Sequence, residues 1–378
     1  MRIRVTVLGL ALALMVALCF ACSRGKDGAP AQNTKSLRVV CVFPLTGPGA
    51  SLGEFLKNGV KLAQEDLKAR YGAQLDLEIE LLDSKNKPGE AISALQAALA
   101  LRKPDAVITA LSSVSKALVP VLDQESIPAV VTTTAMADLP KGSLSCVRIY
   151  PTSRNFVEPV AKYMATKFDQ VAILYVQDDF GESNQKLFSQ FIQQAGKRVT
   201  ASEPYQLTAK DSRVLIAKVL EAKPQAIFVT GYGPAFIAVL KQVREAAKET
   251  PLFTEIGFAN PEVLAALGAD ADGIFFDGTP LEILDTVDPA SVRFCEQYRA
   301  TFKGSPYQVA GFAYDSLILI VESAMKGSGD GKPSKASMIA RSPLNGVMGQ
   351  ITLDSDGECD VPLKMMKREQ GRTVLLQP

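Results

Sequence analysis

Residues 106–134 read AVITALSSVSKALVPVLDQESIPAVVTTT. Two short runs of small and β-branched apolar residues, 106–110 and 129–132, predict buried strands. The segment between them, 115–125, has the apolar spacing of a helix. Two strands joined by a helix are typical of a parallel sheet, because parallel neighbours need a long crossover connection. The stretch therefore predicts an α/β fold with helices on both faces of a parallel sheet.

The same alternation of strands and helices continues on both sides of this stretch. Before it, strands are predicted at 37–43 and 75–82 and helices at 53–71 and 89–101. After it, a second copy of the pattern has helices at 155–167, 183–195, 213–222 and 235–247, and strands at 170–176, 199–205, 226–230 and 252–257. Two copies predict two similar doubly wound lobes, whose carboxyl-end loops face each other across a ligand-binding cleft.

The remainder of the chain does not form a third lobe easily. It has predicted strands at 273–276 and 346–353 and predicted helices at 289–302 and 309–326. The economical interpretation is that the chain returns to the first lobe and finally crosses to the second. This gives a first lobe of 37–150 with 280–345, and a second lobe of 151–279 with 346–378. Three crossings are typical of a hinge that bends.

The composition excludes several classes of function. The chain has 378 residues, enough for two α/β lobes, and its 41 basic and 40 acidic residues nearly cancel. Without a basic stripe, nucleic acid is not expected as a partner. Histidine is absent, which rules out a Ser-His-Asp triad, a Cys-His pair and a zinc site built on histidine. With no phosphate-loop or GxSxG motif either, we expect a binding protein that is not an enzyme, with no cofactor and no metal.

Carboxylate and cysteine patterns do not change that expectation. Asp178 and Asp179 are the one adjacent acidic pair worth considering, and we interpret them as part of a solvated turn. The four cysteines beyond the leader, Cys41, Cys146, Cys295 and Cys359, include no CxxC pair. An exported protein can form disulfides, but the sequence leaves the pairing of these four cysteines open.

The first residues are typical of an export signal. Arg2 and Arg4 precede an apolar run at 5–20, which is short for a membrane span and suits a signal peptide. The run ends in Ala21-Cys22, which resembles a bacterial lipobox and implies a signal at 1–22 with Cys22 lipidated. The alternative is an ordinary cleaved signal with an incidental cysteine. Residues 23–36 have the composition of a flexible tether.

Hydroxyl-rich and glycine-rich loops follow several predicted strands. Ser112 and Ser113 begin the connection from a strand into a helix, where a hydroxyl and free helix N–H groups favour a carboxylate. The alternative is that one of them only caps the helix. Thr133 and Thr134 belong to a second hydroxyl-rich loop, which is also compatible with a simple turn. Tyr232 lies between two glycines on a third loop, either as a ligand contact or as a buried structural tyrosine.

Collinear motifs indicate a family. They are FPLTGPGA at 43–50, LSS at 111–113, IP at 127–128, DDFG at 178–181, TGYGP at 230–234, GFA at 257–259 and AYD at 313–315. Together, over 37–356, they resemble the type I periplasmic binding proteins of branched-chain amino acid importers. Each motif is weak alone, and their shared order carries the resemblance.

The resemblance implies roles for particular residues. In these relatives backbone groups and a threonine of the second hydroxyl loop hold the ligand, and alignment on 138–139 places Ala135 at that threonine, with Thr133 and Thr134 beside it. Phe180 and Leu52 occupy positions where relatives often carry an aromatic residue at the cleft wall. Tyr232 would close over the ligand from the second lobe.

One position departs from the family pattern. Alignment on Gly257 puts Ile256 where amino-acid-binding relatives often have a carboxylate for the ligand ammonium. A buried ammonium without a counter-charge is costly. Either Glu255, Asp178 or Asp179 takes the place of that carboxylate, or the ligand is an apolar acid without an ammonium group.

The resemblance implies a solute-binding lipoprotein of an ABC importer. Such a protein is exported to the periplasm or cell surface, is held at the membrane by its N-terminal lipid, and closes two lobes on a small amino acid or organic acid. Its expected partners are this ligand and an ABC permease and ATPase complex, and we expect it to be a monomer. The alternative is a sensor component with the same fold that reports a small acid or amide without transport.

Overall fold

A computed structural model describes most of the chain. The described residues are 34–136, 139–279, 281, 288–327, 331–361 and 363–376. The predicted signal at 1–22, with Cys22, lies outside them, as does most of the predicted tether at 23–36. The predicted tether extends too far, because its last two residues, 35 and 36, already belong to the first strand, which begins at Lys35. Within the described ranges, no helix combines the length and apolar character needed to cross a membrane.

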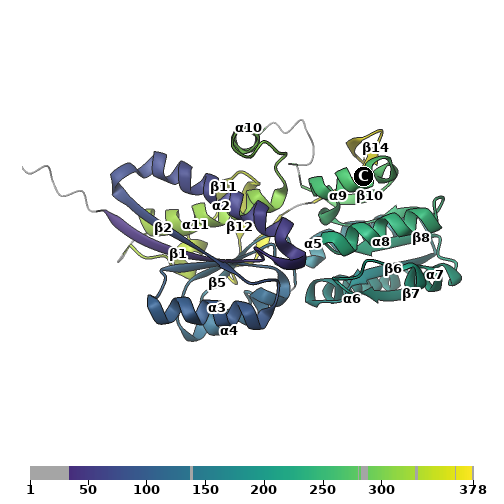
Figure 1. The fold of residues 1–378 in the computed structure, drawn as a ribbon, viewed down its shortest axis with the longest axis horizontal. Helices are drawn as coiled ribbons and strands as arrows, with labels where there is room; N and C mark the ends of the chain where they lie inside the picture. Colours follow the sequence, from purple (N-terminus) through teal and green to yellow (C-terminus); the bar gives the residue numbers. More distant parts are fainter. Residues whose placement is uncertain are drawn as a thin grey trace, which may run out of the picture.

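The first lobe is built on a parallel five-stranded sheet with helices on both faces (Figure 1). The strand order is β2-β1-β3-β4-β5. The strands are β1 (Lys35–Phe43), β2 (Leu75–Asp83), β3 (Ala106–Ala110), β4 (Ala129–Thr132) and β5 (Cys146–Ile149). The helices around this sheet are α2 (Ala50–Tyr71), α3 (Pro88–Leu101), α4 (Ser112–Gln124) and α11 (Gln308–Lys326).

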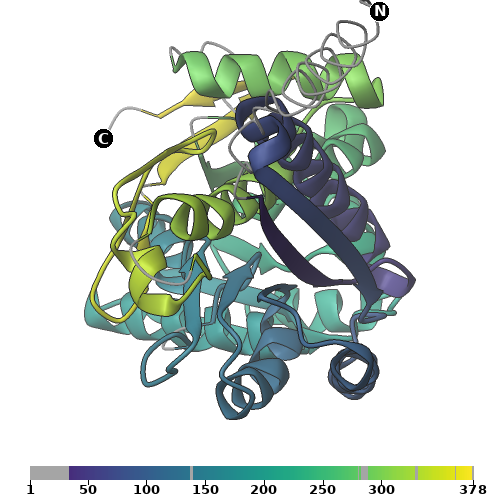
Figure 2. The ribbon, with the colours of Figure 1, turned by 90° about the vertical axis from the view of Figure 1, so that its left-hand side faces the viewer.

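Alternation along β1 explains how this sheet is covered. Val39 and Cys41 face the core shared with α2 and α11, whereas Val40 and Val42 face the core shared with α3 and α4. Both sets are fully buried, so the strand is continuously apolar, as expected of a central parallel strand. Figures 1 and 2 show α3 and α4 on the side of the sheet away from α2 and α11.

The second lobe contains a seven-stranded sheet in the order β15-β14-β10-β9-β8-β6-β7. Its parallel strands are β6 (Gln170–Val176), β7 (Arg198–Tyr205), β8 (Ala226–Thr230), β9 (Leu252–Phe253) and β10 (Phe275–Gly278), and β14 (Lys364–Glu369) and β15 (Arg372–Leu375) add an antiparallel edge. Its helices are α5 (Ser153–Lys167), α6 (Asp179–Gln194), α7 (Arg213–Glu221), α8 (Gly233–Ala246) and α9 (Pro261–Leu267). This lobe repeats the architecture of the first.

A small third sheet corrects the predicted lobe boundary. The antiparallel strands β11 (Leu344–Gly346), β12 (Gly349–Leu353) and β13 (Cys359–Asp360) follow α12 (Lys335–Ile339). Strands β12 and β13 contact β5 of the first lobe, and the Arg148 N–H donates to the Gly357 carbonyl (2.8 Å). The prediction that residues 346–378 all join the second lobe is therefore wrong for β12 and β13, and only β14 and β15 do so. The alternation of a strand shows which side chains are buried, but not which lobe buries them.

The chain crosses between the lobes three times. It leaves the first lobe between β5 and α5, returns between β10 and α10 (Pro289–Phe302), and crosses again between β13 and β14. Figure 1 shows the two lobes side by side. The structure thus has the two lobes and the three connections that the strand and helix pattern predicts.

Two local differences bear on the cleft. Strand β5 was not predicted, because its four residues include the charged Arg148. The predicted strand at 252–257 ends early, since β9 stops at Phe253 and is followed by the 3₁₀ helix η3 (Ile256–Ala259). Glu255 caps this turn by accepting the Gly257 N–H. Cys41, Cys146 and Cys359 are buried thiols without a disulfide bond.

Candidate functional site

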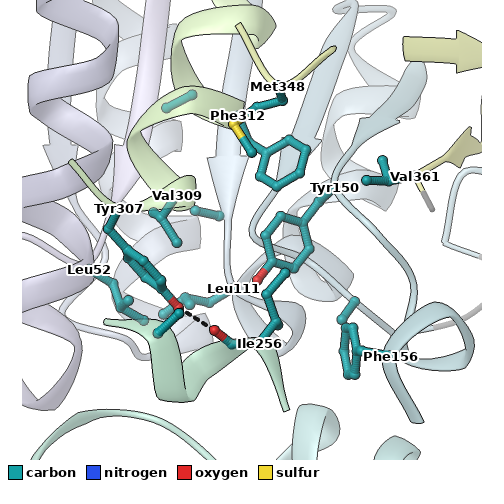
Figure 3. Packing of buried hydrophobic residues seen from close by; sticks show 14 of the residues in the cluster. Leu52, Leu111, Tyr150, Phe156, Ile256, Tyr307, Val309, Phe312, Met348 and Val361 are labelled. Atoms are coloured by element: carbon teal, nitrogen blue, oxygen red, sulfur yellow. Dashed lines mark hydrogen bonds between the residues drawn. The ribbon is translucent and has the colours of Figure 1, made fainter. Parts of the chain in front are cut away.

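A cavity lies between the two lobes, at the carboxyl ends of their parallel strands. Its empty volume, together with the solvent space open to it, is about 440 Å³. The first lobe and the α11 segment contribute Leu52, Leu111, Ser112, Thr133, Tyr150, Tyr307 and Val309, and the second lobe contributes Phe180, Gly231, Tyr232, Glu255 and Gly257. Figure 3 shows Tyr307, Val309, Leu111 and Tyr150 converging from the first-lobe side. The wall is mostly apolar and aromatic with a few polar groups, as is usual for a small-molecule site.

Ser112 presents a hydroxyl donor to this cavity. It is the first residue of α4 and follows Leu111, whose φ of 72° turns the chain sharply at the end of β3. The Ser112 Oγ accepts the N–H groups of Ala135 (3.2 Å) and Met136 (3.4 Å). Because both acceptor positions are used, the remaining capacity of this hydroxyl is its O–H donor. A carboxylate in the cavity is a suitable acceptor for it.

Thr133 supplies a second hydroxyl. Its φ of 47° lies in the left-handed region that threonine seldom adopts, which marks a strained turn at the end of β4. The Leu111 N–H donates to the Thr133 carbonyl (3.1 Å) and holds this turn. The Thr133 Oγ1 is buried and has no hydrogen-bond partner within the part of the chain that the structure describes. A buried polar atom in this situation calls for an explanation, and a bound ligand provides one.

The neighbouring candidates do not line the cavity. Thr134 is fully buried inside the first lobe, where its hydroxyl donates to the Thr132 carbonyl (2.9 Å) and pairs with Ser115 Oγ (2.8 Å). Ala135 contributes its N–H to Ser112, and Ser113 is not among the lining residues. For Thr134 and Ala135 the structure therefore favours a supporting role over the ligand contact expected from the sequence, and it places Ser113 outside the cavity lining.

Two aromatic rings form the second-lobe wall. Phe180 and Tyr232 meet edge to face, with ring centroids 5.9 Å apart. The Tyr232 hydroxyl donates to Asp178 Oδ2 (2.6 Å) and accepts from Asn86 Nδ2 (3.1 Å) of the first lobe. Its ring, rather than its hydroxyl, is thus the part available to a ligand. Leu52, also predicted to line the cleft, lines the cavity from α2 of the first lobe.

The Asp178–Asp179 pair is not the solvated turn that the sequence suggested. Asp178 caps α6 by accepting the Gly181 N–H (2.9 Å) and also binds Tyr232. Asp179 forms an ion pair with Lys116 of α4 (2.6 Å). The Lys116–Asp179 and Asn86–Tyr232 contacts both join the first lobe to the second. The structure therefore has the lobes in contact over the cavity.

Glu255 supplies a carboxylate to the cavity. It is 1% exposed and accepts the N–H groups of Gly257 (2.6 Å) and Gly231 (3.3 Å). Burial raises the pKa of this carboxyl to about 7. Below that pH the group is mainly neutral, and a nearby cation would favour its ionised form.

The side chain of Ile256 is not a ligand contact in this structure. It is buried and does not line the cavity, and its carbonyl accepts from the Tyr307 hydroxyl (3.3 Å) and from Gln308 Nε2 (3.2 Å). The aliphatic Ile256 does not leave the cleft without a carboxylate, because Glu255 places one there a single residue earlier. Of the three substitutes considered, Glu255 is the one that lines the cavity.

Six lining residues were not predicted as ligand contacts, and two of them are the glycines Gly231 and Gly257 of the second lobe. Leu111 and Tyr150 end or follow first-lobe strands, and Tyr307 and Val309 lie at the start of α11. Tyr150 follows the unpredicted strand β5, so its position at a strand end was not visible. Tyr307 reaches the cavity only because α11 returns to the first lobe. Tyr150, an aromatic residue directly before the first lobe crossing, was the signal available in the sequence.

Two buried carboxyl groups predict a pH dependence of stability. Burial raises the pKa of Glu255 and of Asp315 to about 7, whereas such groups titrate near pH 4 in an unfolded chain. Between about pH 4 and pH 7 the folded protein holds protons that the unfolded chain has released, so the free energy of unfolding falls as the pH rises through this window and then levels off. We expect the ligand-free protein to melt at a lower temperature at pH 8 than at pH 5.

Differential scanning calorimetry across this pH range checks the expectation. Glu255→Gln should reduce the difference in melting temperature between pH 5 and pH 8, because the variant lacks one of the two groups. Glu249→Gln, at an exposed residue, is the matched control and should keep the full difference. The same pH dependence in both variants would contradict the assignment to Glu255.

Sequence comparisons are consistent with this geometry. The family model described as periplasmic binding protein matches residues 36–372. The chain is 20% identical over 328 residues to the leucine-, isoleucine-, valine-, threonine- and alanine-binding protein of Pseudomonas aeruginosa, covering 85% of this chain and 87% of that protein. It is 21% identical over 376 residues to a Leu/Ile/Val-binding protein homologue of Brucella melitensis, covering 97% of this chain and all of that protein.

Solved structures share the two-lobed fold. A leucine-binding protein from Thermotoga maritima has a TM-score of 0.82 at 19% identity, with 90% of this chain and 98% of that chain covered. A branched-chain amino acid binding protein from Streptococcus pneumoniae in complex with isoleucine has a TM-score of 0.81 at 21% identity, covering 91% and 100%. A solute-binding protein from R. palustris in complex with benzoate has a TM-score of 0.82 at 18% identity, covering 90% and 96%. At these identities the likeness establishes the type I periplasmic binding fold.

Proposed function

The chain belongs to the periplasmic binding protein family, and from this premise we propose that it is the solute-binding component of an ABC importer of the branched-chain amino acid type. Its ligand is a small α-amino acid with an apolar side chain, held between the two lobes. Binding needs no covalent chemistry, because ligand contacts with both lobes shift an equilibrium between open and closed arrangements. The partners are the permease and ATPase of the importer.

The position of Glu255 opposite the hydroxyl groups of the first lobe carries this proposal. Ser112 and Thr133 offer donors to a carboxylate from one lobe, and Glu255 offers an acceptor to an ammonium group from the other. An α-amino acid bears both groups on one carbon, so it would join the two lobes. The apolar walls at Leu52, Leu111 and Tyr150 suit an apolar side chain.

An apolar carboxylate without an amino group is the second candidate. One observation favours it: the pKa of Glu255 is raised to about 7 by burial, so the group is easily protonated. A neutral Glu255 needs no cation and tolerates an apolar ligand beside it. The relative from R. palustris that was solved with benzoate belongs to the same fold.

The two ligand classes predict opposite effects of pH on affinity. Ammonium binding needs the ionised Glu255, so the affinity for leucine should rise by about tenfold between pH 6 and pH 8, as expected for a group with a pKa near 7. A deaminated analogue, 4-methylpentanoate, should instead bind less tightly as the pH rises. Isothermal titration calorimetry with both ligands at both pH values is the measurement. Tight binding of the analogue without binding of leucine would reject the amino acid and leave the second candidate.

The location of the protein follows from the same proposal. We place it outside the cytoplasm, in the periplasm or at the cell surface, and held to a membrane by a lipid on Cys22. A sensor component would have the same fold. The neighbouring genes distinguish a transport protein from a sensor. Permease and ATPase genes beside this one favour transport, whereas a kinase gene favours sensing.

A further inference from the structure

We propose that Arg148 and Glu358 form a positioning pair that holds the carboxylate-binding loop of the first lobe and ties it to two of the three lobe crossings. The loop is residues 133–136. The inference deepens the proposed function and rests on it in one respect, namely that Ser112 and Thr133 meet the carboxylate of the ligand.

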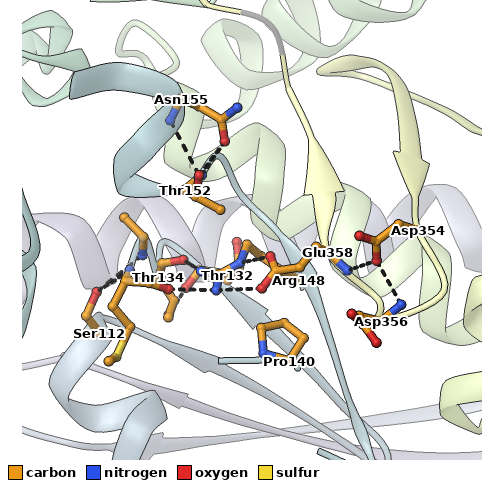
Figure 4. A network of polar contacts seen from close by, with 12 residues as sticks. Ser112, Thr132, Thr134, Pro140, Arg148, Thr152, Asn155, Asp354, Asp356 and Glu358 are labelled. Atoms are coloured by element: carbon orange, nitrogen blue, oxygen red, sulfur yellow. Dashed lines mark hydrogen bonds and ion pairs between the residues drawn. The ribbon is translucent and has the colours of Figure 1, made fainter. Parts of the chain in front are cut away.

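Arg148 binds the loop through hydrogen bonds from inside the first lobe. Its side chain is fully buried, and its guanidinium donates to the Thr134 carbonyl and to the Met136 carbonyl (2.7 Å). The same guanidinium makes a two-point ion pair with Glu358, at 2.6 Å from Nε to Oε2 and 3.3 Å from Nη2 to Oε1. Figure 4 shows Arg148 between Thr134 and Glu358. A planar, bidentate pair of this kind fixes orientation as well as position.

Ser112 holds the loop through a different set of atoms. The carbonyls of residues 134 and 136 are bound by Arg148, while the N–H groups of Ala135 and Met136 are bound by the Ser112 hydroxyl. The loop therefore cannot turn without breaking one set of bonds. Its shape sets the strained φ of Thr133 and the direction in which Ser112 has an O–H left to donate. Arg148 thus acts on the ligand through these two residues and does not line the cavity itself.

The same pair joins two chain crossings. Arg148 lies in β5, which leads into the first crossing, and Glu358 immediately precedes β13, which leads into the third. The Arg148 N–H also donates to the Gly357 carbonyl (2.8 Å), and Asp354 Oδ1 accepts the Glu358 N–H (2.9 Å). Strand β5, the turn before β13 and the carboxylate-binding loop are therefore one connected unit. A change in the pair should alter how tightly the ligand is held, and not only how stable the lobe is.

Glu358→Gln is the variant of choice. It keeps the shape of the side chain and removes the charge, and Glu358 is partly exposed, so the variant is less prone to unfold than one at Arg148. We expect its affinity for the amino acid to fall by about tenfold, the loss expected when a charge-assisted bond is weakened. Arg148→Lys keeps the positive charge but loses the planar guanidinium that can donate two hydrogen bonds to one carboxylate. This variant should lose affinity for the amino acid to a similar extent.

The matched control is Glu80→Gln. Glu80 pairs with Arg38, an almost buried arginine on the same sheet that also donates to a backbone carbonyl, at Arg102. This second pair is outside the cavity lining. If ion pairs of the first lobe act only on stability, Glu80→Gln and Glu358→Gln should lower the melting temperature alike and leave the dissociation constant unchanged. The positioning role predicts a changed dissociation constant for Glu358→Gln only.

Hydrogen exchange of the ligand-free protein gives a readout that needs no ligand. The amides of Ala135 and Met136 should exchange faster in Glu358→Gln than in the wild type and in Glu80→Gln, with the amides of β8 unchanged. Unchanged exchange in the loop would overturn the positioning role, whatever ligand binds. Faster exchange in a protein whose wild type binds no amino acid would retain the positioning role and reject the proposed ligand. Faster exchange with an unaltered dissociation constant would overturn the link to carboxylate recognition.

Discussion

Glu255→Gln should weaken the binding of leucine or a related amino acid by roughly 30-fold to a few thousandfold. Removing one partner of a buried, hydrogen-bonded charge pair costs about 2 to 5 kcal/mol, and each 1.4 kcal/mol is about tenfold in affinity. The neutral amide has no charge to offset the ligand ammonium. It also turns an NH₂ group toward Gly231 N–H or Gly257 N–H, both of which the carboxylate now accepts. Isothermal titration calorimetry at pH 8 is the measurement.

Two comparisons make this result specific. Glu262→Gln changes an exposed carboxylate at the start of α9, close in sequence and outside the cavity lining, and should leave affinity unchanged. The deaminated analogue should bind Glu255→Gln at least as well as it binds the wild type, because no ammonium is involved. The pH dependence of leucine affinity should also disappear. Undiminished leucine affinity in Glu255→Gln would show that another group meets the ammonium.

Gly59→Ala should be the most destabilising of the small substitutions in the first lobe. Gly59 lies where α2 crosses α11, and a Cβ there would lie 2.0 Å from the Ala310 carbonyl oxygen and 2.8 Å from its carbon. A backbone carbonyl inside a helix cannot move aside, so the helices must separate. Overpacking of this kind costs about 1 to 3 kcal/mol or more, against about 1 kcal/mol gained from the helix propensity of alanine. We expect a lower melting temperature in calorimetry.

Gly59→Ala should also reduce ligand affinity, since the start of α11 carries Val309 and follows Tyr307, both at the cavity wall. Gly89→Ala is the control, because Gly89 is also helical and a Cβ there meets no atom within 4 Å. That variant should be as stable as the wild type or slightly more stable. Equal melting temperatures for the two variants would mean that the helices adjust at no cost.

Four of the buried parallel strands were predicted very closely. Strands β3, β4, β6 and β8 have the predicted bounds to the residue, because each is a short, largely apolar run of the kind that a buried parallel strand requires. The buried strand β5 was missed because the fully buried Arg148 interrupts its apolar pattern. A buried charge is uncommon without a partner, and its partner Glu358 lies far away in sequence.

Candidate residues that follow strands were partly predictable. Ser112, Thr133, Phe180 and Tyr232 line the cavity, because residues that follow the carboxyl ends of parallel strands meet at one edge. Leu52 lines it from helix α2. The neighbours Ser113, Thr134 and Ile256 do not. Neighbouring residues in a turn point their side chains in different directions. The left-handed conformations of Leu111 and Thr133 decide which of these side chains faces the cavity. No pattern in the sequence reveals those conformations.

The sequence by itself therefore determined the two α/β lobes, the crossings between them and the loops that carry the site. The reason is that apolar periodicity and strand-ending turns are local properties of the chain. Only the tertiary structure decided that Glu255 rather than Ile256 meets the cavity, that β12 and β13 join the first lobe, and that Arg148 and Glu358 hold the ligand loop. These depend on contacts between residues distant along the chain, where a hydrogen bond or a buried charge finds its partner only after the lobes have packed.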